Sequence, residues 1–235
     1  MEKLWSHLEN AETFRHICTF NVSYIYALGL PMLLNLITSL DEKSLSSKKT
    51  GWSAKFVEGK IPTLHFFSLL EDKIFPVNVQ LRSKDSLGYV PLRDKFHDSF
   101  GHLPFLFSDE QFSNCLHFLA QVYLIVDSPF QRLYLERLYW AVFEFGLIKA
   151  PSSFLDDQEE INKDYKIKIL GAGLISSPAE GLEALNNTKN TQRQFNPGEI
   201  LDWAYNPYGF QDRHYIIESF EEVYLAIAEA FSLKS

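Results

Sequence analysis

The stretch Arg93-Asp94-Lys95-Phe96-His97-Asp98-Ser99-Phe100-Gly101-His102-Leu103-Pro104 places two histidines five residues apart among apolar neighbours. Five residues along an α-helix turn through about 500°, so two histidines on one straight helix would point roughly 140° apart. Gly101 and Pro104 favour a helix end between them, because glycine is common just past a helix end and proline does not continue one. We therefore expect His97 to project from a helix and His102 to return from the following turn, so that both face one metal ion.

A carboxylate suited to the same metal lies on a later predicted helix. Ser128-Pro129-Phe130-Gln131 has the pattern of a helix start, in which serine caps, proline takes the first position and Gln131 closes a capping box. Glu144 follows in the apolar run from Tyr139 to Gly146, where an isolated carboxylate is costly unless it is paired, protonated or bound to a metal. Two neutral imidazoles and one carboxylate form the facial triad of non-haem iron(II) oxygenases.

Plainer interpretations of these residues stay open at this point. A histidine pair at this spacing is more often structural than metal-binding, and a glutamate in an apolar helix more often pairs with a basic group. Arg137 precedes Glu144 by seven residues and is too far along the helix for a direct pair, although a distant arginine or lysine could serve.

Four segments that follow one another along the chain carry motifs of one enzyme family: residues 75–82, 97–104, 138–148 and 170–180. They resemble the pterin-dependent aromatic amino acid hydroxylases, which comprise the phenylalanine, tyrosine and tryptophan hydroxylases, and look nearest to the bacterial phenylalanine 4-monooxygenases. Weaker matches lie at residues 50–66 and 210–220, so the resemblance spans roughly residues 50–222. It implies the catalytic-domain fold of that family.

The resemblance implies a metal centre. His97, His102 and Glu144 would bind iron(II). Tyr139 would lie close to the iron, and Ser176 would support an iron-bound histidine and fix its tautomer.

The resemblance also implies a substrate site. Arg82 would hold the carboxylate of the amino acid, a role suited to a planar guanidinium with two parallel donors. Trp140, Phe145, Gly173 and Ser176 would line the pocket for the aromatic ring. Without the family match, the aromatic residues of this set would be assigned to the core and the arginine to the surface.

A pterin site is implied next to the iron. Phe66 would stack on the pterin ring, and Asp98 and Ile61 would contact it. The chain departs from the family pattern here, because Lys60 stands where leucine is frequent and Arg93 stands where proline is usual. Arg93 brings a positive charge and a more flexible backbone beside the iron site. We expect this departure to affect substrate preference or the order of the loop.

Two further departures concern the substrate. Val90 replaces a common threonine near the substrate backbone, and Pro207 occupies a position associated with substrate choice. We therefore expect phenylalanine as the first substrate, with tryptophan or dual specificity as the alternative.

The predicted activity is an iron- and tetrahydropterin-dependent monooxygenation of a free aromatic amino acid, with tetrahydrobiopterin or a related pterin and O₂ as co-substrate. Two other classes compete with it. One is a hydrolase that activates water on zinc held by the same triad. The other is a non-catalytic protein that keeps the fold to bind a partner.

Composition bounds these possibilities. The chain has 235 residues, 46% hydrophobic and 15% aromatic, which predicts one compact unit with a large core. We expect a mainly α fold with a few short strands (α+β), a helical N-terminal segment and linker over residues 1–49, and a catalytic domain over residues 50–235. Neither a regulatory domain nor a tetramerising helix is expected, which favours a monomer without allosteric activation.

Charge and cysteine content bear on partners and location. A net charge of −8 without a basic cluster argues against nucleic acid and anionic membranes. Cys18 and Cys115 lie in apolar surroundings and favour buried thiols in a reducing cytoplasm. The apolar residues 24–40 contain Gly29, Pro31 and Asn35 and predict a packing helix rather than a membrane span.

Other elements follow from periodicity. Residues 108–122 predict a helix with an apolar face at Phe112, Cys115, Leu116, Leu119 and Val122. Residues 215–217 predict a strand and residues 220–231 a closing helix. Residues 156–164 predict a surface loop, and residues 186–194 show no hydrophobic pattern.

Overall fold

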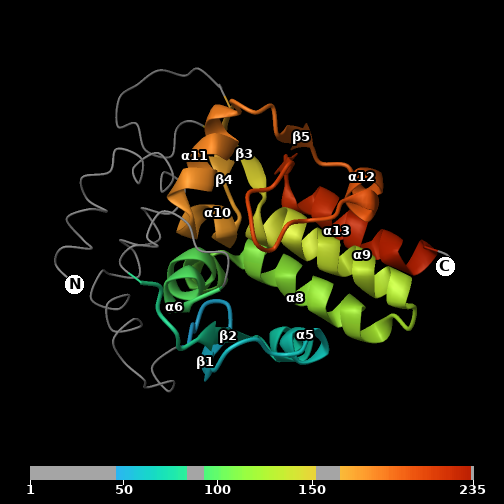
Figure 1. The fold of residues 1–235 in the computed structure, drawn as a ribbon. Coiled ribbons are helices and arrows are strands. Elements are labelled where there is room, and N and C mark those ends of the chain that lie inside the picture. Colours follow the sequence, from blue (N-terminus) through green and yellow to red (C-terminus); the bar gives the residue numbers. More distant parts are fainter. Residues whose placement is uncertain (1–45, 84–92, 152–164, 234–235) are drawn as a thin grey trace.

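The computed structural model describes residues 46–83, 93–151 and 165–233, and Figure 1 shows their arrangement. Helices predominate and the strands are short, which confirms the predicted α+β class. Five predictions fall wholly or mostly outside the described residues: those for Cys18, Val90, residues 24–40, residues 156–164 and the helical N-terminal segment of residues 1–49. The predicted domain boundary at residues 49/50 stays a prediction.

Helix α8 (Glu110–Ile125) lies at the centre of the helical layer. It packs against α5 (Thr63–Glu71), α9 (Pro129–Tyr139) and α13 (Phe220–Glu229). Its predicted apolar positions are all buried, and Asp109 caps it by accepting hydrogen bonds from the backbone N–H groups of residues 111 and 112. The buried thiol of Cys115 belongs to this face, as predicted, and burial raises its pKa.

Two sheets flank the helices. Strands β1 (Ser53–Val57) and β2 (Ile74–Asn78) pair in parallel beside α5. A four-stranded sheet has the order β4-β3-β6-β5, from β3 (Leu147–Pro151), β4 (Tyr165–Ile169), β5 (Gln192–Gln194) and β6 (His214–Ile217). The chain after β4 also forms three short helices: α10 (Ala172–Ser176), α11 (Pro178–Asn186) and α12 (Pro197–Asp202).

The C-terminal elements confirm two predictions and add a strand. Strand β6 and helix α13 lie where the pattern places them, and α13 continues as the 3₁₀ turn Ala230–Ser232. Ser219 and Glu222 form a capping box at its start. Strand β5 was not predicted, because it is a polar strand at the edge of the sheet, where side chains stay partly exposed.

The chain between the two histidines differs from the prediction. The helix does not end there: α6 (Lys95–His97) continues as the π-helix η3 (Asp98–His102) and then as α7 (Leu103–Ser108). The predicted stop at Gly101 is therefore wrong. In a π-helix the hydrogen bonds join residues five apart, so the wider turn brings His97 and His102 toward one face without a break. Pro104 is the second residue of α7 and does not end the helix either.

The helix that carries Glu144 begins as predicted and ends differently. Ser128 caps α9 and accepts a hydrogen bond from the Phe130 N–H. Gln131 does not close the capping box, because its side-chain amide donates to the carbonyl of Leu233. After Tyr139 the helix widens into a second π-helix, η4 (Trp140–Glu144), which ends on the glutamate.

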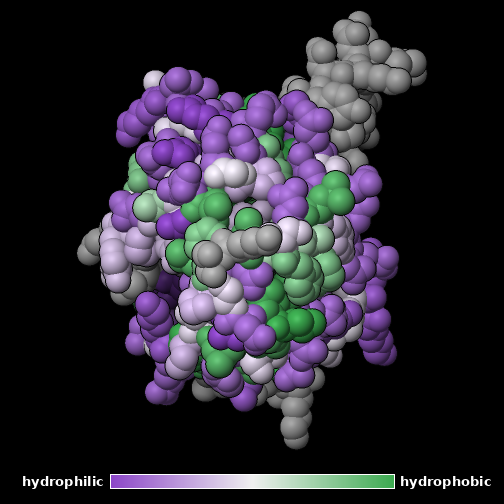
Figure 2. Space-filling model, turned by 90° about the vertical axis from the view of Figure 1, so that its right-hand side faces the viewer, coloured by the Kyte–Doolittle hydropathy of each residue, from purple (hydrophilic) through white to green (hydrophobic). Residues whose placement is uncertain are grey.

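The described surface mixes polar and apolar residues. Figure 2 shows apolar side chains gathered in the middle of one face among polar ones. Among the described helices, the longest apolar stretches are too short or too polar to cross a membrane.

Glycines allow α10 to lie against the two π-helices. A Cβ atom built on Gly171 would lie 2.2 Å from the Glu144 carbonyl oxygen, and one on Gly101 would lie 2.6 Å from the Cβ of Ala172. Real atoms do not approach so closely, so the backbone next to Glu144 admits only glycine at these contacts.

We therefore expect Gly171→Ala to destabilise the fold by about 2–3 kcal/mol, because the added methyl group must push α10 away from the Glu144 backbone. Chemical denaturation measures this change. Gly198→Ala is the matched control, since a Cβ there meets its nearest neighbour, the Asn196 Oδ1 atom, at 3.4 Å. Equal stability of the two variants would contradict the close packing.

Candidate metal centre and adjoining pocket

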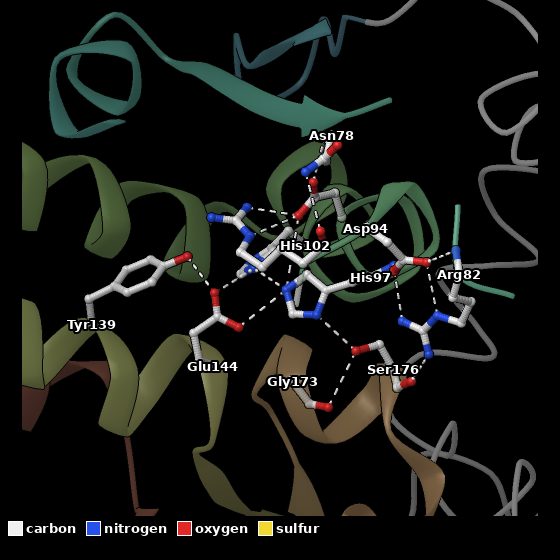
Figure 3. A network of polar contacts seen from close by, with 11 residues as sticks. Asn78, Arg82, Asp94, His97, His102, Tyr139, Glu144, Gly173 and Ser176 are labelled. Atoms are coloured by element: carbon white, nitrogen blue, oxygen red, sulfur yellow. Dashed lines mark hydrogen bonds and ion pairs between the residues drawn. The ribbon is translucent and has the colours of Figure 1, made fainter. Parts of the chain in front are cut away.

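Three predicted ligands meet at one point inside the protein (Figure 3). Glu144 Oε2 lies 3.2 Å from His97 Nε2, and Glu144 Oε1 lies 3.1 Å from His102 Nε2. The two Nε2 atoms are 3.3 Å apart. All three residues are buried, and among the described residues no other group of three potential ligands converges in this way. The donor set of two imidazoles and one carboxylate suits a divalent metal of the iron class.

The pKa shifts of His102 and Glu144 favour the protonation states in which these side chains bind metals. Burial lowers the pKa of His102 and outweighs the opposing effect of Glu144, which favours the neutral imidazole. Burial acts to raise the pKa of Glu144, but the adjacent His102 and His97 hold it well below its ordinary value. The cluster thus offers a charged carboxylate and a neutral imidazole, the forms that bind metals.

Ser176 orients His97 from behind. Its hydroxyl donates to the Gly173 carbonyl at 3.3 Å and lies 2.8 Å from His97 Nδ1. Because the hydroxyl proton is used on Gly173, Nδ1 is assigned as the donor to Ser176, which leaves the lone pair on Nε2. The predicted support of a histidine by Ser176 thus has a geometric basis.

Tyr139 contacts the carboxylate of the triad and also stacks on the ring of His102, with centroids 6.4 Å apart. Its hydroxyl donates to Glu144 Oε1 at 2.7 Å. Burial, together with the charge of Glu144, raises the pKa of Tyr139, so the phenol stays protonated as a donor. Arg137 plays no such part, because its guanidinium donates to the Leu201 carbonyl.

The side chain of Arg82 is held rigidly and is almost fully buried (3% exposed). Its Nε and Nη2 atoms donate to the two oxygens of Asp94 at 2.9 and 2.8 Å, and Nη1 donates to the Ser176 carbonyl at 2.5 Å. Burial acts to raise the pKa of Asp94, but the pairing with Arg82 outweighs it and lowers the pKa. Of the five guanidinium N–H groups, three are used within the described residues, which leaves one on each terminal nitrogen for a ligand.

A cavity of about 350 Å³ lies beside the triad. Its walls include Phe66, Ile61 and Asp98, the three residues assigned to the pterin, and also Tyr139 and Trp140. The departures from the family pattern at Lys60, Arg93 and Pro207 line the same cavity. Its size and its mixture of aromatic walls and hydrogen-bonding side chains suit a ring-shaped small molecule that carries polar groups.

The predicted substrate residues do not all face that cavity. The ring of Trp140 stacks on Phe145, with centroids 5.7 Å apart, and on Tyr205 at 4.3 Å. Phe145 packs over Gly173, where a Cβ atom would lie 2.8 Å from the phenylalanine ring. Of the predicted substrate residues, Trp140 lines the cavity, whereas Arg82, Phe145, Gly173 and Ser176 do not.

Three residues of the site were missed by sequence reasoning. Asp94 caps α6 and holds Arg82, and its spacing three residues before His97 is a cap signal that could have found it. Asn78 donates its backbone N–H to Asp98 Oδ2 at 2.7 Å. Tyr205 lies in a segment without regular structure, and no local sequence pattern predicts that its ring stacks on Trp140.

Comparison with known proteins places the chain. Residues 33–232 match the family model described as biopterin-dependent aromatic amino acid hydroxylase. The chain belongs to this family. It is 31% identical to the phenylalanine-4-hydroxylases of Ralstonia nicotianae over 79% of its length and of Chromobacterium violaceum over 82%.

Solved structures of the family share the fold. The phenylalanine hydroxylase of Legionella pneumophila matches with a TM-score of 0.74 at 26% identity, covering 99% of this chain and 97% of that one. The Chromobacterium violaceum enzyme with bound iron(III) and 7,8-dihydrobiopterin matches with a TM-score of 0.70 at 26% identity, covering 96% and 83%. The chain spans only 55% of the length of the Ralstonia relative and 60% of the Chromobacterium one.

Iron(II) binding should stabilise this protein, because a ligand that binds only the folded state shifts the unfolding equilibrium. At a hundredfold excess over Kd the gain is about 2.7 kcal/mol, or about 5–10 °C in Tm. Glu144→Gln should lose this shift and lower iron affinity at least a hundredfold, as measured by anaerobic thermal shift and metal analysis.

Glu180→Gln is the matched control for that experiment. Glu180 is also a buried carboxylate beside a histidine, with its Oε1 atom 3.6 Å from His214 Nε2, but it lies outside the triad. It should keep the full iron shift. An undiminished shift in the Glu144 variant would remove Glu144 from the metal centre.

Proposed function

We propose that this chain is an iron- and tetrahydropterin-dependent monooxygenase that hydroxylates the ring of a free aromatic amino acid. The observation that carries the proposal is the convergence of His97, His102 and Glu144 beside a cavity walled by Phe66 and Asp98. Membership of the hydroxylase family supports the assignment of iron to the first group and of tetrahydrobiopterin or a related pterin to the second.

Each residue has a physical task in this reaction. His97, His102 and Glu144 would hold iron and leave positions open, and iron with the pterin would supply the activation of O₂. Tyr139 fixes one carboxylate oxygen by donating a hydrogen bond to it, and Ser176 fixes the imidazole of His97 through Nδ1. Preset ligands lower the cost of reorganisation when the metal binds.

Substrate binding is assigned to Arg82 and the aromatic residues near it. Arg82 keeps one N–H on each terminal nitrogen, which suits the two oxygens of an amino acid carboxylate. Asp94 holds the guanidinium in place so that little entropy is lost on binding. The apolar walls around Phe145 and Trp140 exclude water from the reacting ring.

Phenylalanine is the proposed first substrate, supported by the bacterial relatives that bear the name phenylalanine-4-hydroxylase. Tryptophan, or dual specificity, is the alternative, because Val90 and Pro207 depart from the family pattern at positions associated with the substrate. A cytoplasmic location is supported by the free thiol of Cys115. The monomeric state and the lack of nucleic acid or membrane partners stay predictions.

Product analysis tests the proposal. Protein loaded anaerobically with iron(II) receives a tetrahydropterin, air, and phenylalanine, tyrosine or tryptophan in parallel, and products are detected by mass. We expect one added oxygen on one or two substrates, dependent on both iron and pterin. Iron-replete protein that oxygenates none of the three would contradict the proposal and favour a hydrolase or a binding protein.

Arg82→Lys tests the substrate site separately. Lysine keeps the charge that pairs with Asp94 but lacks the fork needed to bind Asp94 and a carboxylate at once. We expect the KM for the amino acid to rise at least tenfold while iron content stays unchanged, measured by steady-state kinetics and metal analysis. An unchanged KM would place the substrate carboxylate elsewhere.

A further inference from the structure

Arg93 holds the carboxylate that the family resemblance assigns to the pterin. Its Nε and Nη2 atoms donate to the same oxygen, Asp98 Oδ1, at 3.1 and 2.8 Å. The Asp98 side chain is 1% exposed and that of Arg93 is 28% exposed, so the arginine closes the solvent side of a buried carboxylate. The other oxygen of Asp98 is used by the Asn78 N–H.

The same guanidinium lies against the aromatic residues of the cavity. The Cζ atom of Arg93 is 5.1 Å from the ring centroid of Phe66 and 5.2 Å from that of Phe75. Cations within about 6 Å of a ring centroid are attracted to it. Arg93, Phe66 and Asp98 all line the cavity beside the triad, so the charged group sits on its inner wall.

We propose that Arg93 is an internal competitor for the pterin: its guanidinium occupies Asp98 Oδ1 and the side of Phe66 that a pterin ring needs, and it must leave both for the pterin to bind. The inference rests on the proposed function. Arg93 thereby sets the pterin affinity of the resting protein.

Arg93 and a pterin compete because both need the same two partners, Asp98 and Phe66. A pterin offers N–H groups that can replace the guanidinium as donors to Asp98, so the carboxylate keeps a partner when the arginine leaves. The pterin ring likewise replaces the cation over Phe66. Because Arg93 is 28% exposed, its side chain has a path to solvent, whereas Asp98 has none.

Arg93→Met tests the inference because it keeps the length of the side chain and removes its donors and charge. The probe is 7,8-dihydrobiopterin, titrated calorimetrically into anaerobic iron(II)-loaded protein. We expect the Kd to fall about fivefold, because the pterin no longer has to displace a partly exposed ion pair and a cation–π interaction. The Tm of the pterin-free variant should fall as well, since the Asp98 carboxylate then lacks its arginine partner.

Two further variants make the result interpretable. Arg132→Met is the matched control, because Arg132 also faces an aromatic ring, with its Cζ atom 5.8 Å from the centroid of Tyr123, but does not line the cavity. It should leave the Kd unchanged. Arg93→Gln, which retains a donor for Asp98, serves if the methionine variant does not fold and should lower the Kd by a smaller factor.

The outcomes separate the inference from the proposed function. Weaker or unchanged pterin binding in folded Arg93 variants would overturn the inference, and weaker binding would make Arg93 a direct pterin contact. Failure of the wild-type protein to bind pterin while it binds iron would instead contradict the proposed function.

Discussion

The buried carboxylate of Glu144 is the constraint around which the described structure is arranged. It lies within 3.2 Å of two histidine Nε2 atoms and accepts a hydrogen bond from Tyr139. Taking a carboxylate out of water costs several kcal/mol, which the contacts with the two imidazoles and Tyr139 offset only in part. A divalent cation at the meeting point would supply the missing charge, so the cost of burial is itself an argument for a metal.

The backbone reaches this arrangement by widening two helices. Residues of the π-helices η3 and η4 supply His102 and Glu144, and His97 lies just before η3. The glycine contacts of α10 then bring Ser176 behind His97 and Gly171 against the Glu144 backbone. The cavity lies beside the triad, and Arg82 is linked to the triad through Ser176, whose carbonyl accepts from Arg82 and whose hydroxyl contacts His97. Arg93 lines the cavity and pairs with Asp98 there.

The residues that converge were easier to predict from the sequence than the backbone that brings them together. Motifs single out His97, His102, Glu144 and Ser176, and periodicity gives the buried face of α8, because burial restricts the residue type at each position. The π-helices did not follow, since local composition favours a stop at Gly101 and only tertiary packing keeps the helix running. Gln131 was misassigned because a partner distant in sequence competes for its amide. Tyr205 and Asp94 owe their roles to contacts across the fold, as does the polar edge strand β5.

The most direct test of the iron centre is anomalous X-ray diffraction at the iron edge from crystals grown anaerobically with iron(II). We expect a single strong peak in contact with His97 Nε2, His102 Nε2 and the carboxylate of Glu144. Full-occupancy iron at any other group of side chains, or a triad without a peak in iron-replete crystals, would contradict the assignment of these three residues as the metal ligands.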